Sequence, residues 1–287
     1  MTTFLRHRVV SGLKYKLVDQ NPRLRRFLFS LMCRNEDADI LLCGSKLRVN
    51  RREEPGYVHA YKHAQSAAAL REELGPLLTL ALLLAPEDTF VDVGANVGFY
   101  SSTLSRLGLL YPQMRFYAFE ANRDTAKRLR LSLEGRNVQI FDFALSSQDA
   151  ELEFVEGSSS ATFGFKGDMH DQQIPNRTQR VQARRLDNVG VVGDSIVMKI
   201  DVEGHERQVL DGASGLFRDG RVKAVYLDGY RDDSLPQYLA SKGFLLYDGR
   251  NLNPHGYEYH LLAIHRAHLA RRGGADSTEE SGLSSHA

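Results

Sequence analysis

Residues 90–100 read Phe-Val-Asp-Val-Gly-Ala-Asn-Val-Gly-Phe-Tyr. A run of β-branched and aromatic residues enters a turn of small residues, and a helical pattern follows. Glycines in such a turn allow a ligand to approach the backbone closely. This order of strand, turn and helix is typical of a nucleotide-binding α/β domain, although the two glycines alone would also suit a purely structural turn.

The residues of this turn distinguish among three nucleotide chemistries. A P-loop is excluded because no Gly-Lys-Ser/Thr follows. The dinucleotide fingerprint fits badly, since Asn96 stands at its second glycine and the carboxylate of Asp92 would repel a pyrophosphate. S-adenosylmethionine carries an ammonium and a sulfonium group where a dinucleotide carries phosphates, so an acid beside the turn favours it.

A second acid supports this interpretation. Residues 116–120 predict a strand that ends in Glu120, which is placed to accept hydrogen bonds from ribose hydroxyls. At the end of the predicted third strand, Asp142 either approaches the adenine amino group or is an ordinary surface acid. The predicted cofactor-binding residues are Asp92, Gly94, Asn96, Gly98, Glu120 and Asp142.

Beyond Pro86 short β-branched runs alternate with helical patterns, which predicts a mostly parallel sheet. Residues 244–247 and 259–264 follow without a helix between them, so we expect a closing antiparallel pair. Residues 151–195 interrupt the alternation as an insertion, with a Ser-rich loop at 157–161 and strands at 151–155 and 180–185.

The segment before Pro86 predicts a hairpin and a helix. Residues 40–49 read as a hairpin turned near Gly44 and Ser45, and residues 67–84 have a helical pattern. Pro76 should break or kink that helix, so a loop followed by a second helix from Pro76 is an equal alternative.

The composition is that of a folded protein without a dominant charge. The 287 residues are 42% hydrophobic and 25% charged, with 37 Lys and Arg against 36 Asp and Glu. This excludes a wholly disordered chain and gives no global reason to expect nucleic acid. Cys33 and Cys43 are too few for a disulfide framework or a cysteine-cluster zinc site. Since no apolar run could cross a bilayer and no secretory signal is evident, we expect a cytoplasmic protein.

Residues 1–34 are locally basic, with eight Lys and Arg against one acid, Asp19. Apolar residues at helical spacing on both sides of Pro22 predict two amphipathic helices, which would dock on the body or a second subunit, or contact an anionic membrane surface. The predicted division is a basic helical extension over 1–36, a main domain over 37–265 and a disordered tail over 266–287.

Five segments of the sequence resemble the FkbM family of S-adenosylmethionine-dependent methyltransferases. They are residues 90–100, 119–122 (Phe-Glu-Ala-Asn), 143–146 (Phe-Ala-Leu-Ser), 181–187 and 198–206 (Met-Lys-Ile-Asp-Val-Glu-Gly-His-Glu). The resemblance implies a class I methyltransferase (Rossmann-like) fold, an α/β fold with seven strands in the order 3-2-1-4-5-7-6 and an antiparallel last strand. It also implies methyl transfer, usually to an oxygen of a sugar, a polyketide or a lipid-linked glycan.

Two positions depart from the family pattern. Ala121 replaces the usual proline but leaves the ribose acid in place. Asp228, at the end of the fifth strand, replaces the usual glutamate and shortens the reach of that carboxylate by one methylene.

The candidate acceptor site lies where the fourth strand is expected to leave the sheet, an edge at which open α/β sheets bind ligands. Transfer to a hydroxyl needs positioning and the removal of one proton, and Asp201, Glu203 and His205 are the candidate bases. Glu203 and His205 would also suit helix caps. Lys199 either pairs with a carboxylate or meets the substrate.

Metal binding is the less favoured alternative at two places. Tyr57, His59, Tyr61 and His63 have a spacing that could place two histidines on a metal, but no third ligand is near, so we expect them at the acceptor mouth. Asp201 and Asp228 could hold Mg²⁺ between neighbouring strand ends. We predict a metal-free site because Gly229 offers no third oxygen ligand.

Taken together, these residues predict an S-adenosylmethionine-dependent methyltransferase that acts on a hydroxyl of a small-molecule or glycan acceptor, such as a sugar, a glycolipid or another secondary metabolite. An N-methyl acceptor is the alternative within the same chemistry. A non-catalytic cofactor-binding subunit that docks through residues 1–34 is a second alternative. Nucleic-acid methylation is disfavoured because residues 201–204 do not resemble a base-clamping motif.

Overall fold

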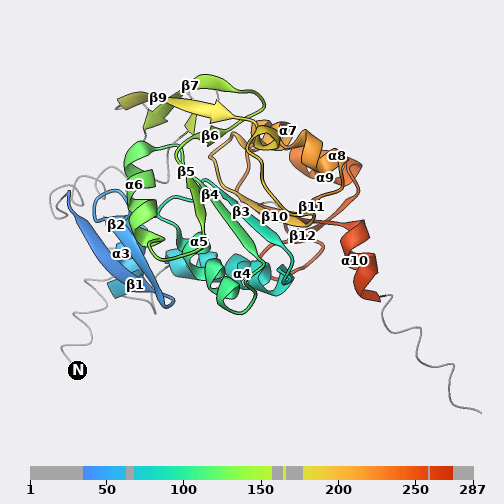
Figure 1. The fold of residues 1–287 in the computed structure, drawn as a ribbon, viewed down its shortest axis with the longest axis horizontal. Helices are drawn as coiled ribbons and strands as arrows, with labels where there is room; N and C mark the ends of the chain where they lie inside the picture. The colour runs from blue at the N-terminus through green and yellow to red at the C-terminus, as the bar shows by residue number, and fades with distance from the viewer. Residues whose placement is uncertain (1–34, 63–67, 157–163, 166–176, 258, 274–287) are drawn as a thin grey trace, which may run out of the picture.

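The computed structural model describes residues 35–62, 68–156, 164–165, 177–257 and 259–273 (Figure 1). Its centre is a seven-stranded sheet in the order β12-β13-β11-β10-β3-β4-β5. The strands are β3 (Thr89–Val93), β4 (Arg115–Phe119), β5 (Gln139–Phe141), β10 (Ile196–Ile200), β11 (Val222–Asp228), β12 (Phe244–Asp248) and β13 (His260–His265). Numbered along the chain and read from β5, this is the order 3-2-1-4-5-7-6. The fold is therefore the class I methyltransferase fold that we expected, with β13 antiparallel to both β11 and β12.

The central strands are parallel and buried on both faces. Every residue of β3 and of β10 is buried, which explains why these strands read as nearly continuous apolar runs. The charged exceptions to this apolar pattern are Asp92 in β3 and Lys199 in β10, which are also buried and lie at paired positions of the β3–β10 ladder.

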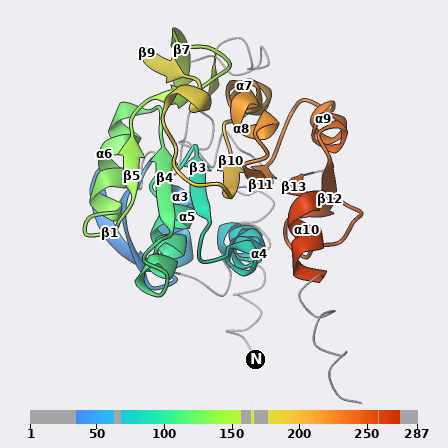
Figure 2. The same ribbon diagram turned by 45° about the vertical axis from the view of Figure 1, so that its right-hand side comes forward.

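Helices cover both faces of the sheet (Figures 1 and 2). On one face, Phe90 and Val197 pack with α4 and α5, and α6 covers Ala118. On the other face, Val91 and Met198 pack with α7, α8 and α9. The bounds are α3 (Pro55–Lys62), α4 (Ala68–Leu83), α5 (Phe99–Leu104), α6 (Arg123–Ser132), α7 (Glu206–Gly212), α8 (Ser214–Arg218), α9 (Leu235–Ser241) and α10 (Arg266–Gly273), with 3-10 turns at Ser105–Leu109 and Leu186–Asn188.

A hairpin of β1 (Asp37–Leu42) and β2 (Ser45–Asn50) lies beside α6. Its turn is formed by Cys43 and Gly44, one residue earlier than expected, and both have positive φ, as a two-residue hairpin turn of this twist requires. The backbone N–H of Arg48 donates to Ser132 Oγ of α6 at 2.8 Å, which joins the hairpin to this helix.

Pro76 lies inside α4, which continues through it as one helix, so the expected break is wrong. Leu77 and Leu80 bury their side chains in the core beneath the helix. The burial of these two side chains just after the proline stabilises the helix, although Pro76 has no N–H to donate to the preceding turn.

A second, four-stranded sheet has the order β6-β9-β7-β8. Its strands are β6 (Ala144–Leu145), β7 (Ala150–Glu156), β8 (Gly164–Phe165) and β9 (Arg177–Arg184). β7 and β9 confirm the two strands predicted in the insertion, whereas the Ser-rich loop at 157–161 lies outside the described residues.

Both ends of the chain carry predictions that fall outside the described residues, namely the two helices of 1–34 and the tail from 274 onward. Residues 266–273, which we expected in the tail, instead form α10. The backbone N–H of Arg266 donates to the carbonyl of Gly243, which fixes the start of this helix against the sheet. Within the described ranges, no helix combines the length and the apolar character needed to cross a bilayer.

Candidate active site

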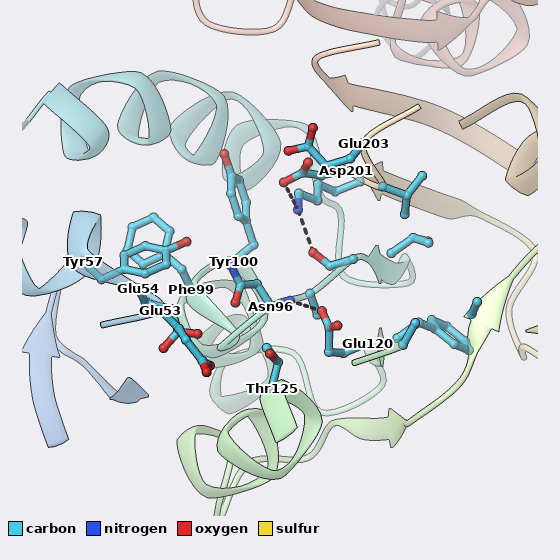
Figure 3. Close-up of a pocket in the computed structure, with 18 of the residues that line it drawn as sticks. Glu53, Glu54, Tyr57, Asn96, Phe99, Tyr100, Glu120, Thr125, Asp201 and Glu203 are labelled. Atoms are coloured by element: carbon cyan, nitrogen blue, oxygen red, sulfur yellow. Dashed lines mark hydrogen bonds and ion pairs between the residues drawn. The ribbon is translucent and has the colours of Figure 1, made fainter. Parts of the chain in front are cut away.

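A pocket of about 300 Å³ opens where β3, β4 and β10 end. Figure 3 shows Glu120 on one side, Asp201 and Glu203 on another, and Glu53, Glu54 and Tyr57 across from them, with Asn96 and Tyr100 between. Of the nine predicted site residues, five line this pocket: Gly94, Asn96, Glu120, Asp201 and Glu203.

The turn after β3 is shaped by its contact with the end of β10. Gly94 has a φ of +73°, and a Cβ there would lie 1.9 Å from the carbonyl oxygen of Asp201. Asn96 also has positive φ, and Gly98, at +88°, precedes α5 at its N-cap. Only glycine at position 94 allows the two strand ends to meet, and this contact forms the floor of the pocket.

Glu120 is held by two backbone amides. Its Oε2 accepts from Asn96 N–H at 2.9 Å and its Oε1 accepts from Asn122 N–H at 2.8 Å. Burial raises the pKa of Glu120 to about 7, although both hydrogen bonds act in the opposite direction. Each oxygen keeps a lone pair, so the carboxylate can still accept hydroxyl donors from a ligand.

Asp92 lies beneath the turn, outside the pocket lining. Its Oδ2 accepts from both N–H and Oγ–H of Ser101, at 3.2 and 2.6 Å. Its Oδ1 is 3.7 Å from Nζ of Lys199. Asp92 therefore supports the turn and compensates a buried lysine, from a buried position outside the lining where we expected it to meet a ligand.

Gly98 and Asp142 also lie outside the lining. Asp142 is exposed and forms an ion pair with Arg130 of α6 at 3.0 Å. A hydrogen bond from Arg130 holds the pKa of Asp142 below its usual range. The next residue, Phe143, lines the pocket instead.

Lys199 and Asp201 form a buried ion pair at the end of β10. Nζ of Lys199 donates to Asp201 Oδ2 and to the carbonyl of Gly94, both at 3.2 Å. Burial acts to lower the pKa of Lys199, but the carboxylates of Asp201 and Asp92 outweigh it and raise that pKa. The pKa of Asp201 is raised by burial to about 6. Of the two alternatives for Lys199, the structure shows the pairing with a carboxylate.

Glu203 lies at the pocket mouth with a φ of 54°, an uncommon conformation for this residue type. Its side chain is 37% exposed and its Oε2 is 3.4 Å from Arg231. Burial and the charge of Asp201 raise the pKa of Glu203 to about 7, against the effect of Arg231. This places the pKa of an accessible carboxylate close to neutral pH.

His205 is turned away from the pocket lining. It is buried, and its Nε2 lies 3.0 Å from the hydroxyl of Ser146. It occupies the N-cap position of α7, as the cap alternative predicted, but its side chain makes no capping hydrogen bond. His205 joins the loop after β10 to the end of β6.

A cover over the pocket is formed by residues 53–57 and Glu73, all of which precede β3. Tyr57 was expected at the acceptor mouth and lines the pocket, whereas Tyr61 is 51% exposed, away from it, and His63 lies outside the described residues. Glu53 and Glu54 both pair with Arg128 of α6, which fixes the cover to the main domain. Sequence reasoning missed these acids and Glu73 because no local motif marks them.

Within the described ranges, no group of three or more His, Cys, Asp or Glu side chains is arranged so that it could hold a metal ion. Asp228, the second carboxylate of the proposed Mg²⁺ alternative, does not line the pocket, and its Oδ1 lies 3.2 Å from Nδ1 of His260.

Residues 92–246 match the model of the methyltransferase FkbM domain, which covers more than half of the chain. The chain belongs to the FkbM methyltransferase family. As an FkbM methyltransferase it is an S-adenosylmethionine-dependent methyltransferase, and the sheet order fits that assignment. The cover over the pocket lies before the matched domain.

Three solved structures illustrate the similarity of this FkbM chain to other methyltransferases. Precorrin-6y C5,15-methyltransferase from Geobacter metallireducens has 17% identity, covering 67% of this chain and 88% of that one, with a TM-score of 0.36. A TehB-like SAM-dependent methyltransferase from Corynebacterium glutamicum has 10% identity, 73% and 96% coverage, and a TM-score of 0.38. TYW2 from M. jannaschii, in complex with AdoMet, has 10% identity, 80% and 85% coverage, and a TM-score of 0.36. No curated protein matches the sequence.

Proposed function

We propose that this FkbM methyltransferase transfers the methyl group of S-adenosylmethionine to a hydroxyl oxygen of a sugar, a glycolipid or another secondary metabolite. The observation that carries the proposal is Glu203, an accessible carboxylate beside the strand ends whose pKa lies near 7. A general base is most effective when its pKa is close to the working pH.

The residues of the β3 and β4 ends fit the adenosine part of the cofactor. Glu120 presents fixed carboxylate oxygens to the two ribose hydroxyls. Phe119, Ala121 and Phe143 offer an apolar slot for the base. Oδ1 of Asn96 is buried without a hydrogen-bond partner among the described residues, which leaves an acceptor for the ligand. When bound, S-adenosylmethionine supplies an electrophilic methyl group.

Glu203 and Asp201 take different roles on the acceptor side. Asp201 is held by Lys199, so its charge is compensated and it serves to orient the acceptor hydroxyl. Glu203 is less constrained, because its ion-pair neighbour in the described structure is the exposed Arg231, at 3.4 Å. In the ionised form, Glu203 would take up the proton of the acceptor hydroxyl.

The aromatic residues opposite these carboxylates suit a ring-shaped acceptor. The rings of Tyr57 and Phe99 lie 5.7 Å apart, and both residues line the pocket. Aromatic faces and carboxylates together recognise the apolar faces and the hydroxyls of a sugar ring.

A second candidate is N-methylation, and the charge of the pocket favours it. The lining contains six carboxylates, at Glu53, Glu54, Glu73, Glu120, Asp201 and Glu203, and one lysine, Lys199. Such an excess of negative charge also attracts an ammonium group.

Incubation with S-adenosylmethionine labelled in its methyl group and a panel of neutral glycosides, polyols, phenols and amines separates these candidates. We expect an O-methyl product, identified by mass spectrometry and NMR, whose formation drops with Glu203→Gln. Products methylated only on nitrogen would replace the first proposal with the second.

A further inference from the structure

Glu73, on α4, is a pocket carboxylate that the chemistry above does not use. Its Oε2 is fully buried and has no hydrogen-bond partner among the described residues. It lies before residue 92, so it is outside the segment that matches the family. A buried carboxylate oxygen without a partner is unfavourable unless a ligand compensates it.

The other carboxylates of the pocket have their partners in the protein. Glu53 and Glu54 share Arg128, Glu120 holds two backbone amides, and Asp201 has Lys199. Glu203 is near Arg231. Among the carboxylates that line the pocket in the described part of the chain, Glu73 is the one with a fully buried oxygen, Oε2, that accepts no hydrogen bond.

The surroundings of Glu73 are strongly negative. Burial raises the pKa of Glu73 to about 7, and the carboxylate of Asp228 raises it further, against the effects of the Tyr100 hydroxyl and the Lys199 ammonium. Lys199 is already shared between Asp201 and Asp92. A positive charge carried by a ligand would therefore compensate the negative charge at the unpaired oxygen of Glu73 and at the carboxylates near it.

The position of this charge relative to Glu120 indicates which ligand carries it. In the proposed function Glu120 and Phe143 take the nucleoside end, and Glu73 lines the same pocket within electrostatic reach of Lys199 and Asp201. The part of S-adenosylmethionine beyond its ribose carries the sulfonium and the ammonium. After methyl transfer, the product S-adenosylhomocysteine keeps the ammonium but has a neutral sulfur.

We infer that Glu73 makes this pocket selective for the charged cofactor over its neutral-sulfur product. The inference rests on the cofactor half of the proposed function. Glu73 would favour the loaded methyl donor and promote release of the product, and it does so from a helix outside the family-matched domain. An amine on the acceptor is the competing explanation for the unpaired oxygen, and the test below distinguishes it.

Calorimetric binding of three ligands tests the inference without turnover. S-adenosylmethionine and sinefungin, whose amine replaces the methylated sulfonium, each carry one more positive charge than S-adenosylhomocysteine. At pH 8 we expect the wild-type protein to bind the two cationic ligands at least about tenfold more tightly than the product, because each brings one more positive charge next to the carboxylate. Glu73→Gln should reduce this ratio to within about threefold.

Glu72→Gln is the matched control, because Glu72 is the adjacent residue of α4 and its side chain is 63% exposed. It should keep the wild-type ratio. Glu73→Asp, which retains the charge, should keep a preference for the cationic ligands, and thermal melting of each variant confirms that it is folded.

The outcomes separate this inference from the proposal on which it rests. If Glu73→Gln weakens all three ligands equally, or leaves the ratio unchanged, Glu73 is structural or serves the acceptor, and the inference is wrong. If the wild type binds the cofactor without preference over the product, the inference also fails, while the proposed function stands. If the wild type binds none of the three, the cofactor half of the proposed function fails as well.

Discussion

Replacing Glu120 with Gln should weaken binding of S-adenosylmethionine by about 30- to 1000-fold. Both oxygens of Glu120 are fixed by backbone N–H groups, so two ribose hydroxyls would meet a preoriented carboxylate. Hydrogen bonds to a charged acceptor contribute about 1.5–3 kcal/mol each. Gln keeps one acceptor oxygen and loses the charge, so we expect a loss of about 2–4 kcal/mol, which corresponds to this range of affinity.

The same substitution should leave the stability of the fold nearly unchanged. Burial raises the pKa of Glu120 from 4.5 to about 7, so ionisation of this carboxyl destabilises the folded state increasingly from about pH 4.5, and fully above about pH 7. A shift of this size corresponds to about 3 kcal/mol, which Gln would remove. Against this, one backbone N–H would face an amide NH₂, which costs about 1–3 kcal/mol. The net change in unfolding free energy at pH 8 should stay within about 2 kcal/mol.

Calorimetry of cofactor binding at pH 8, combined with urea unfolding of the same samples, measures both quantities. Asp142→Asn is the control, because Asp142 is an exposed acid paired with Arg130 and lies outside the pocket lining. It should bind the cofactor like the wild type. Unchanged affinity in Glu120→Gln, or a large loss in Asp142→Asn, would refute the placement of the ribose at Glu120.

Three further predictions concern catalysis, the floor of the pocket and metal dependence. Glu203→Gln should lower kcat by roughly 10²–10⁴-fold and leave cofactor affinity nearly unchanged. Because the pKa of Glu203 is raised to about 7, the kcat of the wild-type protein should rise as the pH increases through about 7. A kcat that does not change with pH would contradict the role of Glu203 as the base. Gly94→Ala would place a Cβ 1.9 Å from the Asp201 carbonyl oxygen, so it should lower the unfolding free energy far more than Gly135→Ala, where φ is also positive but no atom lies within 4 Å. Left-handed strain alone costs roughly 1–2 kcal/mol, and equal losses in urea unfolding of the two variants would show that the Asp201 contact yields freely. Methyl transfer after exhaustive EDTA treatment should keep most of its rate, whereas activity lost with EDTA and restored by Mg²⁺ would contradict the metal-free site.

The architecture of the sheet could be predicted because its signals are local. Each central strand is a short apolar run buried on both faces, and the helices between them follow a regular alternation. The exact strand order came from the family resemblance, since alternation alone does not order the strands. The helix over residues 67–84 was predicted, but whether it continues through Pro76 could not be decided, because the contacts of Leu77 and Leu80 that stabilise it come from distant parts of the chain.

The candidate site was predicted well only where backbone geometry determines it. Gly94 and Glu120 are placed by the turn and by the end of a strand, both of which can be inferred from the local sequence. The directions of Asp142 and His205 depend instead on competing partners, Arg130 on α6 and Ser146 after β6. No sequence spacing identifies either partner. The direction in which an acid or a histidine at a strand end points therefore cannot be predicted until its tertiary contacts are known.

The division of the pocket between two stretches of chain gives this enzyme a simple route to new acceptors. The strand ends at 93–96 and 119–121 form one wall, while the cover of 53–57 and Glu73 forms another, and Arg128 joins the cover to α6 through Glu53 and Glu54. On the proposed function, selection for a new substrate can act on residues 55–57 of the cover while the methyl-donor wall and Glu73 stay constant. A laboratory library confined to residues 55–57, with Glu73, Arg128 and the two partners of Arg128 kept, should yield variants that differ in acceptor range yet fold alike.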